Sequence, residues 1–263
     1  MLQASPSKPR LLAITNHKGG VGKTTTAVNL AACLGRSRTV LLVDCDPQAS
    51  ASRWLGASKL PAKPFLEDVL RGEADFCQAI HPTQVTGVQL VPTSPELSVV
   101  ERYLAAEVGS ETILRECLEV EATAQFDYVI LDSPPQLGML SLNTLVAARE
   151  LIIPVAPDPL AIDGLTQLLS TVDLVQRRLN ARLTIAGILL FRVRTTTRLA
   201  KAVAADLAAR FPELLYPTSI RATIRAEEAP SHHLPLIDCY PLSSAAQDYA
   251  RLAAAVIEQE SAA

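Results

Sequence analysis

Residues 11 to 28 read as an apolar run, a glycine-rich turn and the start of a helix, in that order. The run Leu11–Thr15 is followed by Lys18-Gly19-Gly20-Val21-Gly22, which leads directly into Lys23-Thr24-Thr25. A strand that feeds such a turn into a helix presents backbone N–H groups and a positive helix end to phosphate oxygens. In phosphate loops the lysine reaches the terminal phosphates and the next hydroxyl binds Mg²⁺. Lys23 and Thr24 are the candidates for these roles, and residues 18 to 25 form the candidate phosphate site.

Short apolar runs and helical patterns alternate along the rest of the chain. Apolar runs without polar alternation are typical of parallel strands covered on both faces. We therefore predict an α/β fold with a doubly wound, mostly parallel sheet, helices on both faces and the ligand at the carboxyl ends of the strands. The predicted strands are Leu11–Thr15, Thr39–Asp44, Val88–Val91, Tyr128–Leu131, Leu151–Val155 and Ile185–Phe191, with shorter candidates at Leu215–Ile220 and Leu236–Cys239. The predicted helices are 23–36, 97–106, 110–123, 139–149, 163–179, 197–210 and 244–258.

Length and composition favour one compact unit. A chain of 263 residues with 49% hydrophobic residues fits a single domain, residues 1–263, with residues 1–9 as a flexible tail. Residues 56–82 are the least regular stretch, and we expect a loop and a short helix there. No apolar run approaches the roughly 20 residues that span a bilayer, and the N-terminus lacks a signal-peptide core, so we expect a cytoplasmic protein. Five widely spaced cysteines without a C-x-x-C pair weigh against zinc or iron–sulfur ligation.

Two aspartates follow predicted strands. Asp46 lies in Asp44-Cys45-Asp46-Pro47-Gln48 after the second strand, and Asp132 follows Tyr128–Leu131. Because the carboxyl ends of parallel strands share one edge with the phosphate loop, either carboxylate could act on water or a metal ion there. A simple turn after a strand is the alternative for Asp46, since Asp-Pro is common in turns.

The loop carries a family resemblance. Its sequence K-G-G-V-G-K-T-T, with His17 in place of the usual first glycine, resembles the deviant Walker A box of the ParA/MinD ATPases. Asp44–Gln48 and Asp132-Ser133-Pro134-Pro135 resemble the D-x-D-P-Q and D-x-P-P boxes of that family, and Glu228–His232 resembles its E-A-P-S-h motif. The similarity extends over about residues 10 to 258.

The resemblance implies a slow, Mg²⁺-dependent ATPase that is a homodimer with ATP and a monomer with ADP. It implies that Lys18 crosses the dimer to the nucleotide of the partner, and that Lys23 and Asp46 are catalytic, with Asp46 positioning the attacking water. It also implies that Thr24, Asp46 and Asp132 surround Mg²⁺.

Basic residues are concentrated in one window. Residues 176 to 225 hold ten basic side chains and only two acidic ones, Asp206 and Glu213, although the whole chain has a net charge of −3. Such asymmetry indicates a surface that faces a polyanion, the alternative being solvated arginines on several elements. In Soj-type members of the family, arginines that match Arg194 and Arg225 contact DNA without sequence preference. From charge alone, further DNA-binding candidates are Arg192, Arg198, Lys201 and Arg221.

The expected function is therefore DNA partition or segregation. The ATP-bound dimer would bind non-specific double-stranded DNA of the nucleoid, and a ParB-like partner would stimulate hydrolysis and release it. The alternatives are a related ATPase that positions a non-DNA cargo, a metabolic or metallocluster ATPase of the same superfamily, and a MinD-like membrane regulator. The acidic end of the chain, residues 253–261, lacks the basic amphipathic helix that a membrane role needs, so no membrane partner is expected. Arg192 and Ile220-Arg221-Ala222-Thr223 depart from the family pattern near the expected adenine pocket and DNA face.

Overall fold

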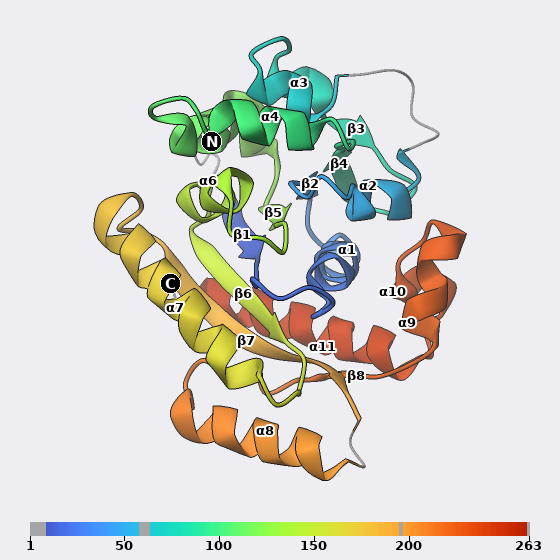
Figure 1. Ribbon diagram of the computed structural model, residues 1–263. Helices are drawn as coiled ribbons and strands as arrows, with labels where there is room; N and C mark the ends of the chain where they lie inside the picture. Colours follow the sequence, from blue (N-terminus) through green and yellow to red (C-terminus); the bar gives the residue numbers. More distant parts are fainter. Residues whose placement is uncertain (1–8, 58–63, 195–196, 262–263) are drawn as a thin grey trace.

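A computed structural model describes residues 9–57, 64–194 and 197–261. Apart from Pro9, the predicted N-terminal tail lies outside the described residues. One sheet of eight strands, in the order β3-β4-β2-β5-β1-β6-β7-β8, forms the centre of the molecule (Figure 1). All neighbouring strands are parallel except β3 and β4, which are antiparallel. The strands are β1 (Arg10–Ile14), β2 (Val40–Asp44), β3 (His81–Pro82), β4 (Val88–Val91), β5 (Tyr128–Asp132), β6 (Glu150–Val155), β7 (Thr184–Val193) and β8 (Ile220–Arg221).

Helices cover both faces of the sheet, as the sequence predicted. The α-helices are α1 (Lys23–Leu34), α2 (Ser50–Trp54), α3 (Leu66–Leu70), α4 (Leu97–Leu104), α5 (Ile113–Leu118), α6 (Met139–Ala147), α7 (Ala161–Arg178), α8 (Arg198–Arg210), α9 (Arg225–Glu228), α10 (Leu236–Cys239) and α11 (Ser244–Glu258). The 3₁₀ turns are η2 (Phe76–Ala79), η3 (Ser110–Thr112), η4 (Glu121–Gln125), η5 (Ala229–His232) and η6 (Gln259–Ser261). No helix of the described residues is long and apolar enough to cross a membrane.

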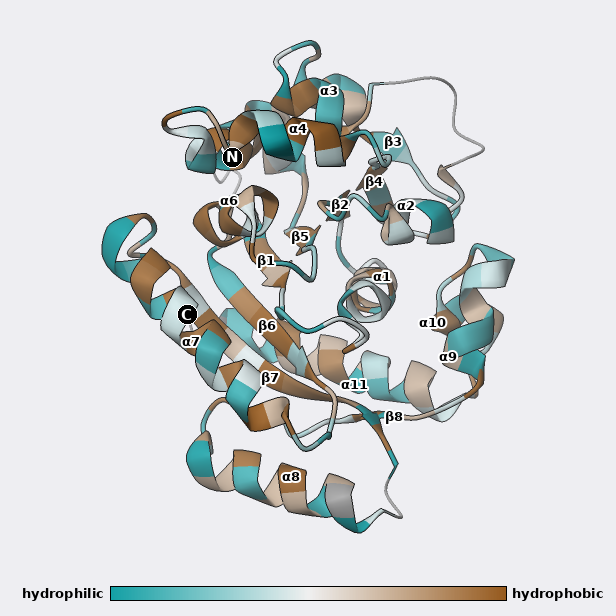
Figure 2. Ribbon diagram, in the orientation of Figure 1, coloured by the Kyte–Doolittle hydropathy of each residue, from teal (hydrophilic) through white to brown (hydrophobic). Residues whose placement is uncertain are grey.

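Alternate residues of each strand belong to different cores. In β1, Leu12 and Ile14 pack with apolar side chains of α1 and α11, whereas Ala13 packs with those of α6 and α7. All three are fully buried. Burial on both faces explains why the strand sequences are continuously apolar. Figure 2 shows brown, apolar residues along β6 and β7 and a mixture of brown and teal along the outer helices α7 and α8.

Several sequence-based boundaries were wrong. Leu236–Cys239 is the short helix α10 rather than a strand, because a short apolar run does not distinguish a buried helical turn from a strand. The predicted strand Leu215–Ile220 is reduced to one bridge between Leu215 and Ile188 and to the first residue of β8. The predicted helix 110–123 is divided into η3, α5 and η4. The Thr123 hydroxyl competes for helical carbonyls there, donating to Leu118 O and Val120 O, both at 2.8 Å.

The irregular stretch is more ordered than expected in its described part. Residues 64–82 contain α3, the 3₁₀ turn η2 and the edge strand β3. The sequence did not predict β3, which is two residues long and includes Pro82. Proline lacks the N–H that a central strand needs, and it is tolerated at this edge of the sheet.

Candidate nucleotide and magnesium site

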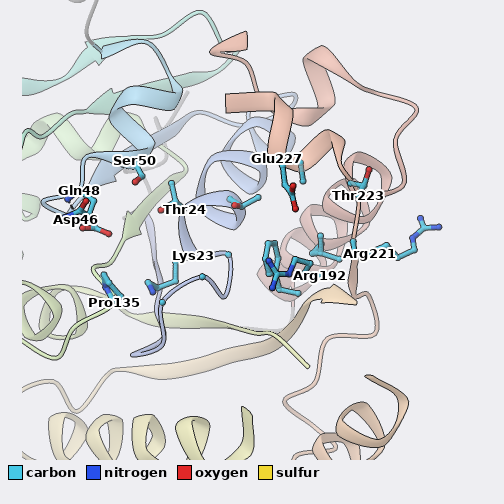
Figure 3. A pocket seen from close by; sticks show the side chains of 18 residues that line it. Lys23, Thr24, Asp46, Gln48, Ser50, Pro135, Arg192, Arg221, Thr223 and Glu227 are labelled. Atoms are coloured by element: carbon cyan, nitrogen blue, oxygen red, sulfur yellow. Dashed lines mark hydrogen bonds between the residues drawn. The ribbon is translucent and has the colours of Figure 1, made fainter. Parts of the chain in front are cut away.

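A cavity of about 380 Å³ opens at the carboxyl edge of the sheet. Its first end is formed by the glycine loop, the start of α1 and the segment after β2. Its second end is formed by the end of β7 and residues 220–227. Figure 3 shows Lys23, Asp46 and Pro135 at the first end and Thr223 and Glu227 at the second. The two ends of the cavity differ chemically, which suits a ligand with a phosphate tail.

The loop conformation depends on glycine at two positions. Gly20 and Gly22 have φ values of 73° and 86°, in the left-handed region that side chains disfavour. At Gly22 the space is also closed, because a Cβ atom would lie 2.4 Å from the Phe191 ring. The Phe191 ring, near the end of β7, therefore packs directly against the loop at Gly22. The sequence contained no signal for this contact.

The start of α1 is free to bind an anion. Gly22 is the N-cap residue, no side chain caps the helix and no acidic residue lies in its first turn. The first N–H groups of a helix lack partners within the helix and carry its positive dipole end. Thr24 and Thr25 line the cavity at this point. The geometry is that of a backbone phosphate cradle.

Two lysines of the loop have different surroundings. Lys23 is buried and its Nζ donates to Lys18 O at 3.0 Å. Burial lowers the pKa of Lys23, while Asp132 and Asp46 act in the opposite direction. Lys18 does not line the cavity, and its Nζ lies 2.6 Å from Asp158 Oδ2. Val21 is buried rather than lining the cavity.

Three carboxylates meet at the ends of β2 and β5. Asp44 accepts hydrogen bonds from Ser52 N at 2.8 Å and Ser52 Oγ at 2.7 Å, which links it to α2. Asp46 lines the cavity and accepts a bond from Gln48 N at 2.8 Å. Burial raises the pKa of Asp46, and hydrogen bonding from Gln48 and the charge of Lys23 oppose the rise.

Asp132, like Asp44, is fully buried. Neither of its carboxylate oxygens has a hydrogen-bond partner of good geometry among the described residues. Burial and the charge of Asp44 raise its pKa, whereas the nearby Thr24 hydroxyl lowers it. A buried carboxylate without a partner, next to a hydroxyl and a second acid, matches the oxygen ligands that Mg²⁺ prefers. Thr24, Asp132 and Asp46 are thus able to hold the ion or its waters.

The second end of the cavity has apolar walls and two charged side chains that form no ion pair in the described part of the chain. Phe191, Ala222 and Ala226 supply apolar surface. Arg192, with the unusual φ value of 56°, and Glu227 also line the cavity, and neither forms an ion pair within the described chain. An apolar slot with polar groups at its edge suits a planar base.

The basic window of the sequence is not one patch. Arg177 and Arg210 pair with Asp173 and Asp206 one helical turn earlier, whereas Arg182 and Arg194 lie at opposite ends of β7, roughly 30 Å apart at the rise of a strand. Arg194, Arg198 and Lys201 are exposed and form no ion pair within the described chain.

Two of the predicted DNA-binding arginines are engaged by acids. Arg221 binds Asp248 through its Nε at 2.9 Å and its Nη2 at 2.8 Å, and the Asp248 side chain is only 3% exposed. Arg225 pairs with Glu228 at 2.7 Å and lies over the Tyr240 ring at 4.9 Å, but this pair is open to solvent.

A strand, an uncapped glycine loop, a lysine and a buried acid at the edge of a parallel sheet define a phosphate-loop nucleotide hydrolase. Comparison with known proteins specifies the class further. A family model described as an AAA domain matches residues 9–185. The chain is 41% identical to the sporulation initiation inhibitor protein Soj of Bacillus subtilis, over 93% of this chain and 96% of the relative. It is 39% identical to the chromosome partitioning protein ParA of Caulobacter vibrioides, over 95% of each chain.

A solved structure shares the fold. Cobyrinic acid a,c-diamide synthase from Mycobacterium smegmatis, with bound ATP analogue and magnesium, superposes with a TM-score of 0.81 at 34% identity, over 96% of each chain. The chain belongs to the ParA/Soj family of partition ATPases. It is an ATPase whose cofactors are ATP and Mg²⁺.

Proposed function

We propose that this partition ATPase, with residues 1–263 as one domain, switches between two states. With ATP it dimerises and binds double-stranded DNA without sequence preference, and hydrolysis releases it. The observation that carries the proposal is the loop itself. Lys18 lies next to a phosphate-binding loop, and Lys23, Asp46 and the buried, unpartnered carboxylate of Asp132 lie close to that loop. The chain is also about 40% identical to partitioning proteins.

The proposed chemistry uses charge neutralisation and positioning. ATP supplies the phosphoryl group, and Mg²⁺ offsets the negative charge on it. The backbone N–H groups of residues 19–25 hold the phosphates, and Lys23 neutralises their terminal charge. Asp46 orients the attacking water, while Thr24 and Asp132 bind the metal. Lys18 contributes from the partner subunit, where its ammonium group offsets charge that develops during transfer.

The proposed DNA surface is formed by exposed basic residues that follow β7 and begin α8. Arg194, Arg198 and Lys201 are exposed there without acidic partners. Arg225 is a fourth contributor, because an exposed ion pair is worth little and a DNA phosphate can replace Glu228. We leave Arg221 out of this surface, since its guanidinium group holds the buried Asp248. Arg192 faces the cavity.

The proposed cycle is completed by a ParB-like protein that stimulates slow hydrolysis. The ATPase would then act in the cytoplasm, associated with the nucleoid. The similarity to chromosome partitioning proteins supports this part of the proposal.

Binding to a non-specific DNA duplex tests the DNA part directly. Affinity is measured with ATP, with ADP and without nucleotide, each at two salt concentrations. We expect binding that requires ATP and weakens steeply with salt, because condensed counterions are released from the DNA. Arg194→Ala should weaken binding and reduce the salt dependence by about one unit of slope. Arg177→Ala, on α7 and paired with Asp173, is the matched control. Absence of binding in every nucleotide state would refute the DNA role and leave the ATPase site unaffected.

A further inference from the structure

Lys18 is held inside its own subunit by three contacts. Its Nζ lies 2.6 Å from Asp158 Oδ2, its backbone N–H donates to Asn16 Oδ1 at 3.0 Å, and its carbonyl accepts from Lys23 Nζ at 3.0 Å. Asn16 in turn donates to Pro154 O at 2.8 Å. The loop is thus tied to the end of β6 and to the turn that follows it.

Asp158 is fixed by the turn in which it lies. Its Oδ1 accepts a bond from Leu160 N at 3.0 Å, and its carbonyl accepts from Ala161 N at 3.1 Å, at the start of α7. The other carboxylate oxygen, Oδ2, is the one that faces Lys18. Because the turn holds Asp158 independently of the lysine, Asp158 stays in place when Lys18 moves.

The ammonium group of Lys18 cannot bind Asp158 and a nucleotide in another subunit at the same time. Both side chains are partly open to solvent, 40% for Lys18 and 30% for Asp158, so the pair can open without leaving a buried charge. We propose that Asp158 is a positioning residue that keeps Lys18 in its own subunit, and that opening of this ion pair is a step of ATP-dependent dimerisation. This inference rests on the proposed role of Lys18 across the dimer.

The third contact links the ion pair to nucleotide binding. Lys23 is the lysine proposed to bind the phosphates, and in this structure its Nζ donates to the Lys18 carbonyl. Charge-assisted bonds to phosphate are stronger than a bond to a neutral carbonyl, so Lys23 turns toward the phosphates when they are present. Lys18 then loses one of its three contacts before any second subunit arrives. Nucleotide binding therefore prepares the opening of the Lys18–Asp158 pair.

The size of the effect follows from the exposure of the pair. A partly exposed ion pair changes an equilibrium by about 2- to 5-fold. A symmetric dimer opens two such pairs, one in each subunit, so the two factors multiply. Removing the charge of Asp158 should therefore tighten the ATP-dependent dimer by about 4- to 25-fold.

Asp158→Asn is the suitable variant. The asparagine side chain keeps an oxygen for Leu160 N and has the same shape, but it no longer carries the charge that faces Lys18. Asp163→Asn is the matched control, because Asp163 is an exposed acid on α7 without an ion pair in the described chain. The dimer dissociation constant is measured by sedimentation with a non-hydrolysable ATP analogue, and monomer affinity for the analogue and thermal unfolding are measured beside it.

The proposal expects a tighter dimer for Asp158→Asn, unchanged dimerisation for Asp163→Asn and no loss of thermal stability in either. A structural role of Asp158 would lower stability or weaken the dimer, and would not tighten it. An unchanged or weaker dimer in Asp158→Asn would overturn the inference. Lys18→Ala tests the proposed cross-subunit role of Lys18 separately from the role of its ion pair with Asp158. If that variant dimerises with the analogue as the native chain does, the proposed cross-subunit role of Lys18 fails, whatever the result for Asp158.

Discussion

Alanine at Gly22 is expected to strain the phosphate loop in two separable ways. The first is conformational, because Gly22 has a φ value of 86°. A residue with a side chain in the left-handed region costs about 1–2 kcal/mol. The second is steric, because the new Cβ atom would lie 2.4 Å from Phe191 Cζ. Overpacking of this kind typically costs about 1–3 kcal/mol, since the ring or the loop must move.

The neighbouring glycines separate these two contributions. A Cβ atom at Gly20 would meet nothing within 4 Å, yet Gly20 has a φ value of 73°, so Gly20→Ala tests the backbone term alone. Gly19 has neither a positive φ value nor a neighbour within 4 Å. Gly19→Ala should therefore be neutral or slightly stabilising, by up to about 1 kcal/mol, because alanine restricts the unfolded chain.

The assay is the free energy of unfolding in urea without nucleotide, at one temperature for all variants. We expect a loss of about 1–2 kcal/mol for Gly20→Ala and about 2–5 kcal/mol for Gly22→Ala. Gly22→Ala should also bind ATP more weakly, because relief of the clash moves the phosphate cradle. Equal stability of Gly20→Ala and Gly22→Ala would refute the role assigned to Phe191.

Three further predictions concern the acids and the DNA surface. Asp46→Ala should hydrolyse ATP at least about 100-fold more slowly while the ATP-dependent dimer still forms, and normal phosphate release would exclude a water-positioning role. Arg194→Ala should lower DNA affinity with unchanged ATP binding, as measured by fluorescence anisotropy and calorimetry. Arg221→Ala should instead destabilise the fold by about 1–3 kcal/mol, because it removes partners of the buried Asp248 carboxylate. Burial raises the pKa of Asp248, but hydrogen bonds from Arg221 and Arg251 hold it below its ordinary value. This stabilisation is therefore full above about pH 4 and is lost as the pH falls through the lower folded pKa, so urea melts of the native chain and the variant should converge in acid.

Much of the fold could be predicted because its signals are local. The loop from Lys18 to Thr25 is contiguous, and the six longest strands are mainly apolar runs whose positions the structure confirms within a few residues. The α/β class and the parallel sheet follow from their alternation with helices. Leu236–Cys239 failed because four apolar residues carry no period long enough to separate a helix from a strand.

The roles of the site residues remain predictions, but their arrangement depends on the order of the strands. The sheet places β1 between β5 and β6, so the loop after β1 has Asp132 on one side and Asp158 on the other. Lys18 and Asp158 are 140 residues apart in the chain, and no spacing rule relates them.

What the amino-acid order established was the chemistry of the loop, the fold class and the family. The folded chain added the neighbours of these residues: the Phe191 ring against Gly22, Asp158 beside Lys18, and Asp248 as the partner of Arg221. The physical reason is that local conformation follows from adjacent residues, whereas the electrostatic energy of a charged side chain depends on its neighbours in space. Those neighbours come from distant parts of the sequence and are set by the order of the strands.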